Sequence, residues 1–167
     1  MSIEKKLKQG LEKVGQDWQA RRYDSALEEV IRLLDLSPGN PVLLVLRAQL
    51  TQLQEDDSAS PSLFDVTKDL KLATNLDQNS PIPLIELGYF TFAVQDDAGK
   101  ASRYFQKAIG LCRELLTEAL IGQAKSYYEL GQDSDAFACL VEAHSLLSHV
   151  GKDGREQIVE QLRLLQR

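Results

Sequence analysis

The chain has 167 residues, of which 43% are hydrophobic and 26% are charged. This balance is typical of a folded globular protein, and a chain of this length buries about 70% of its unfolded surface without needing a disulfide or a metal ion. Lys and Arg number 19 against 25 Asp and Glu, which gives a formal net charge of -6. Nucleic-acid-binding domains neutralise phosphates with clustered basic residues, so the composition argues against that function.

No targeting or membrane signal is visible in the sequence. The first residues are charged and no apolar stretch follows them, so we expect no secretory signal. The longest aliphatic run, 42–46, is far shorter than the roughly 20 residues that cross a bilayer. Only Cys112 and Cys139 are present, too few for a disulfide framework or a zinc site. We therefore expect a cytoplasmic protein that does not bind membranes.

Apolar residues recur at helical spacing along the whole chain, and strand-like alternation is nearly missing. The first helix carries the stripe Leu7, Leu11, Val14 and Trp18. A second helix follows the turn at 21–22 and ends at Ser37-Pro38-Gly39, where proline and glycine disfavour continuation.

Three later helices share one start signal, a side-chain acceptor followed by a proline at the first helical position. These starts are Asn40-Pro41, Ser60-Pro61 and Ser80-Pro81. Together with the first two helices, the spacing predicts an all-α protein of about nine helices, the later ones covering 41–54, 61–77, 81–94, 97–112, 115–130, 133–148 and 155–166.

Similar segments return along the chain. The spacing W-x2-L-G-x2-Y is matched, with substitutions, by Leu11-x2-Val14-Gly15-x2-Trp18, Leu44-x2-Arg47-Ala48-x2-Thr51, Leu84-x2-Leu87-Gly88-x2-Thr91 and Leu120-x2-Gln123-Ala124-x2-Tyr127. A second spacing, A-x3-F, is matched by Ala26-x3-Val30, Val66-x3-Leu70, Ala101-x3-Phe105 and Ala136-x3-Leu140, at intervals of 40, 35 and 35 residues. The chain thereby resembles the tetratricopeptide-repeat (TPR) family, whose repeat is a helix pair of about 34 residues.

This resemblance implies a right-handed α-α superhelix, an α solenoid of about four TPR-like helix pairs. The whole chain, 1–167, would be a single domain with repeats at 3–38, 41–78, 81–113 and 115–148 and a capping helix at 155–166. The small residues Gly15, Ala48, Gly88 and Ala124 would lie where the helices of a pair approach closely. The second repeat fits least well, because Arg47 and Thr51 occupy slots for leucine and an aromatic residue and the insertion 54–60 follows. A non-repeating helical bundle is the alternative.

Catalytic and metal-binding patterns are missing from the sequence. Neither Gly99-Lys100 nor Gly151-Lys152 has the upstream glycine or the hydroxyl residue of a phosphate-binding loop. His144 and His149 are five residues apart and would not share a helix face, and the acidic pairs at 56–57 and 96–97 do not fit a calcium loop. We expect no catalytic residue, no metal ion, no cofactor and no enzymatic activity.

The resemblance further implies that the first helix of each pair lines a concave surface that binds peptides. Residues that follow the core slots are rotated by about 100° around the helix and would point to that surface. They form a predicted groove of Val45, Gln49, Ile82, Ile85, Tyr89, Phe92, Ile121, Lys125 and Tyr128. A second interpretation is that Ile85, Phe92 and Ile121 of this set pack between neighbouring helices. The family's clamp for chaperone carboxylates uses several inward cations, and Lys125 is the only one in this set.

We therefore expect a non-catalytic scaffold or adaptor that binds a peptide or helix of a partner protein. A small secretion or assembly chaperone that holds an unstable client is the alternative, and a metal- or cofactor-dependent activity is a third hypothesis from another class. The stripe Ile158, Val159, Leu162 and Leu165 would cap the last repeat or dock into a second copy. Both a monomer and a weak homodimer are compatible with this sequence.

Overall fold

The computed structural model describes residues 2–54 and 62–146. In these ranges the chain is all-helical and has no strand, which confirms the predicted fold class. The helices are α1 (Ile3–Gln19), α2 (Tyr23–Leu36), α3 (Pro41–Thr51), α4 (Leu63–Leu76), α5 (Ile82–Ala93), α6 (Ala98–Glu129) and α7 (Asp133–Leu146). The predicted capping helix 155–166 and nearly all of the insertion 54–60 lie outside the described residues.

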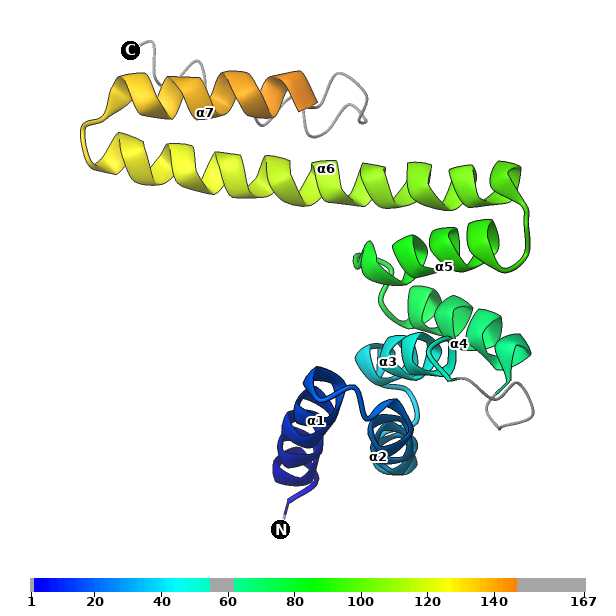
Figure 1. Ribbon diagram of the computed structural model, residues 1–167. Helices are drawn as coiled ribbons and strands as arrows, with labels where there is room; N and C mark the ends of the chain where they lie inside the picture. The colour runs from blue at the N-terminus through cyan, green and yellow to red at the C-terminus, as the bar shows by residue number, and fades with distance from the viewer. Residues whose placement is uncertain (1, 55–61, 147–167) are drawn as a thin grey trace. The chain divides into compact units, whose positions relative to one another are not determined.

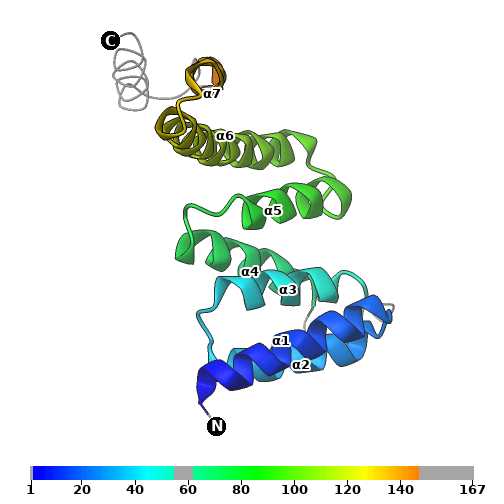
Figure 2. The same ribbon diagram turned by 90° about the vertical axis from the view of Figure 1, so that its left-hand side faces the viewer.

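The chain divides into two compact units, residues 1–108 and 109–167. In the first unit, consecutive helices pack as antiparallel neighbours, with α1 beside α2 and α3 beside α4 (Figures 1 and 2). Their buried side chains form one continuous core that runs from Val14 through Leu33, Leu43 and Leu70 to Phe90. The described part of the second unit has a smaller cluster, in which Leu120 of α6 packs near Ala143 of α7.

The predicted helix starts are confirmed in part. The Asn40 side chain accepts hydrogen bonds from the backbone N–H groups of Val42 (3.0 Å) and Leu43 (3.3 Å), so Asn40 caps α3 as predicted. The helix α4 begins later than predicted, because Ser62 and Asp65 form a capping box in which Asp65 accepts from the Ser62 backbone N–H at 2.9 Å. Ser80 does not cap α5, whose N-cap is Pro81 and has no side-chain hydrogen bond.

One predicted helix boundary is wrong. Sequence spacing predicted separate helices at 97–112 and 115–130, but α6 is a single helix of 32 residues, Ala98–Glu129 (Figure 1). The reason is local, because residues 111–116 (Leu-Cys-Arg-Glu-Leu-Leu) contain no glycine, proline or capping residue that would end a helix. The boundary after α6 is confirmed, and there Gly131 adopts a φ of +70° that favours glycine.

Three of the four predicted small residues lie at packed positions, and at Gly88 the approach of another helix is close. Ala48 and Ala124 are buried, and a Cβ added to Gly88 would lie 2.6 Å from the Phe105 ring. Gly15 is the exception, because it is exposed and an added Cβ would meet nothing within 4 Å. In the first pair the close approach is at Gly10 instead, where a Cβ would lie 2.5 Å from Leu33.

This difference arises because the buried stripe of α1 has another register. Its buried residues are Gly10, Val14 and Asp17, whereas the predicted core residue Leu11 is exposed. Trp18 is half-buried and packs edge-to-face on Tyr23, with ring centroids 6.2 Å apart. Asp17, a carboxylate, occupies a core position of α1. A helix face predicted from apolar residues alone does not include it.

Candidate partner-binding surface

The residues predicted to line a groove in the first unit lie on α3 and α5, two helices that contact each other. On α5 they recur every three or four positions and so share one side of the helix. We call this surface the α3–α5 face and define it by Val42, Gln49, Ile82, Ile85, Glu86, Tyr89 and Phe92.

The apolar members of the α3–α5 face are strongly exposed. The exposed fractions are 58% for Val42, 54% for Ile82, 62% for Tyr89 and 59% for Phe92. For Val42, Ile82 and Phe92, packing between neighbouring helices is therefore not the explanation. Ile85 is half-buried, and the predicted groove residue Val45 is buried in the core of the unit.

A pocket opens between the amino-terminal ends of α3 and α5. Its volume is about 220 Å³, and it is lined by Pro41, Val42, Val45, Leu46, Gln49, Asp77, Ser80, Ile82 and Pro83. Val45 therefore contributes to the pocket wall although it is mostly covered. Most of the lining is apolar, which is typical of a site that accepts hydrocarbon groups.

Two contacts hold the α3–α5 face in place. The Gln49 side-chain amide donates a hydrogen bond to Glu86 Oε1 at 2.8 Å and thereby joins α3 to α5. Tyr89 packs edge-to-face against Phe105 of α6, with ring centroids 5.1 Å apart. The close approach of Phe105 to Gly88 brings this ring beneath Tyr89 and fixes one side of the exposed aromatic group.

The predicted groove residues of the second unit all lie on α6. Ile121 is half-buried and packs against the cluster of Leu120 and Ala143. Lys125 is exposed, and Tyr128 is also largely exposed. Ile121 thus takes part in packing, while Lys125 and Tyr128 are accessible.

Sequence reasoning missed the ion pair that joins α3 to α4. Arg47 donates two hydrogen bonds to the buried carboxylate of Asp69, from Nε to Oδ2 and from Nη2 to Oδ1, both 2.6 Å long. The ion pair with Asp69 raises the pKa of Arg47 above its usual value. Arg47 occupies a leucine slot of the repeat pattern. A cation at a core position requires a buried anionic partner, and this departure from the pattern was the signal that could have revealed Asp69.

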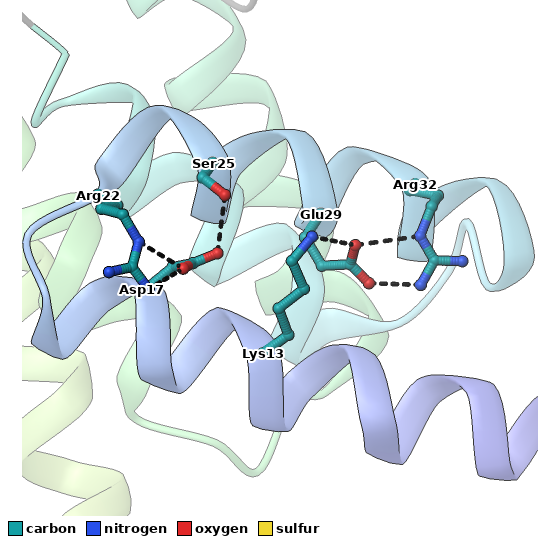
Figure 3. Close-up of polar contacts among 6 residues, drawn as sticks. All are labelled: Lys13, Asp17, Arg22, Ser25, Glu29 and Arg32. Atoms are coloured by element: carbon teal, nitrogen blue, oxygen red, sulfur yellow. Dashed lines mark hydrogen bonds and ion pairs between the residues drawn. The ribbon is translucent and has the colours of Figure 1, made fainter.

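Two further buried carboxylates join α1 to α2 (Figure 3). Asp17 accepts hydrogen bonds from Ser25 at 2.8 Å and from Arg22 at 2.6 and 2.9 Å, and these bonds lower its pKa. Glu29 pairs with Arg32 and, at 3.3 Å, with Lys13, and its pKa is lowered chiefly by the Arg32 hydrogen bonds. Both carboxylates are therefore fully ionised at neutral pH, and they hold the first helix pair together.

Chemistry-bearing clusters are not found in the described ranges. No group of three or more His, Cys, Asp or Glu side chains within 2–54 and 62–146 could hold a metal ion. Cys112 and Cys139 are free thiols. None of the described helices combines the length and apolar character needed to cross a membrane.

Comparison with known proteins bears on the fold alone. No family model and no curated protein matches this sequence. A crystal structure of MamA protein, which contains TPRs, matches with a TM-score of 0.51 at 19% identity, over 97% of this chain and 91% of that chain. A second MamA crystal structure gives a TM-score of 0.48 at 19% identity, over 92% of each chain.

The first of these likenesses agrees with the helix pairs and the small-residue contacts described above. The chain therefore has the fold of a TPR-like α solenoid.

Proposed function

We propose that this protein is a non-catalytic interaction scaffold that binds a segment of a partner protein on the α3–α5 face. One observation carries the proposal: four large apolar side chains of the α3–α5 face remain exposed, and two of them, Val42 and Ile82, line an apolar pocket. Large exposed apolar patches on folded domains generally mark interaction sites.

The chemistry of the face suits a protein partner. Tyrosine and other large side chains placed near the centre of an interface are the residues whose truncation costs binding most, about 2 kcal/mol or more. Tyr89 and Phe92 lie one helical turn apart on α5, and Tyr89 is already ordered by its contact with Phe105. An ordered anchor loses less conformational entropy on binding, so the face is prepared for a partner.

The test compares two phenylalanine truncations. We would capture partners from the native lysate with the wild-type chain, with Phe92→Ala and with Phe64→Ala, and quantify each captured protein by mass spectrometry. Phe64 is a matched control, because it is also strongly exposed but lies on α4, outside the α3–α5 face.

Partners that bind the α3–α5 face should be depleted about tenfold or more with Phe92→Ala and retained with Phe64→Ala. Circular dichroism should show the same helix content for all three proteins. Undiminished capture by Phe92→Ala would refute the assignment of binding to this face. Tyr128→Ala, measured separately, shows whether α6 contributes a contact of its own.

A further inference from the structure

The pocket between α3 and α5 has the size and lining for one apolar side chain. Its walls are made by Val42, Val45, Leu46, Ile82 and Pro83, and its volume is about 220 Å³. For comparison, a dry cavity of roughly 150 Å³ lined by aliphatic and aromatic side chains accommodates benzene. A leucine, isoleucine or phenylalanine side chain of a bound segment therefore fits.

The charged residue in the lining of this pocket is acidic. Among the described residues that line it, Asp77 at the carboxyl end of α4 is the charged one. Glu86 lies one helical turn after the lining residue Ile82 on α5 and accepts a hydrogen bond from Gln49, which also lines the pocket. The nearby cation on α3, Arg47, is engaged by Asp69 and does not neutralise either group.

The backbone does not reverse this sign. The amino ends of α3 and α5 each present about half a positive charge, and the carboxyl end of α4 presents about half a negative one. The two full negative charges of Asp77 and Glu86 exceed that sum, so the mouth of the pocket favours a cation.

We infer that the partner segment carries an apolar side chain with a Lys or Arg within one helical turn of it. The apolar side chain enters the pocket, and the cation pairs with Asp77 or Glu86. This inference rests on the proposed function and specifies the partner's chemistry at the same face. Electrostatic complementarity of this kind selects among partners and raises association rates more than it raises affinity.

The probe is a phage-displayed library of random 12-residue peptides, selected against the full chain. One selection uses the wild type, a second uses Asp77→Lys/Glu86→Lys, and a third uses Ile82→Glu, which places a charge on the pocket wall. The matched control is Glu28→Lys/Asp35→Lys, which changes the net charge equally at two exposed positions of α2. Selected peptides are then synthesised, and their affinities for all four proteins and for Phe92→Ala are measured by fluorescence polarisation.

Peptides selected on the wild type should combine an apolar residue with Lys or Arg within four positions. Their affinity should fall at least tenfold on Asp77→Lys/Glu86→Lys, stay within twofold on the control, and weaken as salt rises. Selection on Asp77→Lys/Glu86→Lys should instead favour Asp or Glu beside the apolar residue.

The outcomes separate the two proposals. If peptides lose binding on Ile82→Glu but show no basic preference, or bind the charge-reversed protein equally well, the inferred partner chemistry is wrong and the proposed function stands. If no peptide binds, or if the bound peptides are insensitive to both Ile82→Glu and Phe92→Ala, the α3–α5 face is not a binding site and both proposals fail.

Discussion

Replacing Arg47 by methionine should destabilise the protein by about 3 kcal/mol. The Asp69 side chain is only 3% exposed, and Arg47 occupies both of its oxygens at 2.6 Å. Breaking a buried ion pair by removing one partner costs about 3–5 kcal/mol, because it leaves a buried charge without compensation. The Arg47 side chain is 27% exposed, so water can partly replace it, and we expect the lower end of that range.

A double substitution separates the stranded charge from the lost packing. In Arg47→Met/Asp69→Leu neither charge remains, and the free energy of unfolding should return to within about 1 kcal/mol of the wild type. The measurement is urea unfolding followed by circular dichroism at 25 °C on the wild type, both single variants and the double variant. A cost below about 1 kcal/mol for Arg47→Met, or a double variant as unstable as the sum of the singles, would refute this account of the pair.

Three further predictions concern the helices. Gly88→Ala should destabilise the protein by about 1–3 kcal/mol, because the added Cβ clashes with Phe105. Gly15→Ala should stabilise it by about 0.5–1 kcal/mol, because the added Cβ meets no neighbour. Equal urea unfolding midpoints for the two variants would contradict this. Glu114→Pro should cost about 3 kcal/mol because α6 is continuous there, and a melting temperature equal to that of Glu114→Ala would indicate a break. The folded-state pKa values of Asp17 and Glu29 are lowered, so the stability that these carboxylates contribute is present at neutral pH and is lost as the pH falls below about 4. Between pH 6 and pH 3 the melting temperature should therefore fall less steeply for Asp17→Asn than for the wild type.

Local sequence rules predicted the elements of the fold well where the signal is local. The cap at Asn40 and the helix end near residue 130 depend on a few adjacent residues, and both are confirmed. The predicted break between helices 97–112 and 115–130 was wrong because it was inferred from the repeat spacing and not from local residues. Residues 111–116 contain nothing that ends a helix, so α6 continues through them. Local helix propensity thus overrides the repeat period at this place.

Pairwise interactions between helices were less predictable. Asp17 and Asp69 are core residues only because Arg22, Ser25 and Arg47 satisfy their oxygens, and an apolar stripe does not reveal such partners. On the candidate surface, the α5 residues selected by periodicity include three that are exposed, Ile82, Tyr89 and Phe92, while Ile85 is half-buried. Periodicity did not distinguish Val45, which is buried, because side-chain burial on α3 depends on the approach of other helices.

The position of Trp18 allows the unfolding of the first helix pair to be followed separately from that of the other helices. It is the only tryptophan of the sequence, and it lies half-buried against Tyr23 in the first helix pair. Its fluorescence therefore reports the unfolding of α1 and α2, while circular dichroism reports every helix. In a solenoid, where each repeat contacts only its neighbours, the ends can unfold before the centre. The difference between the two transition midpoints thus measures how cooperatively the first helix pair is coupled to the rest of the protein.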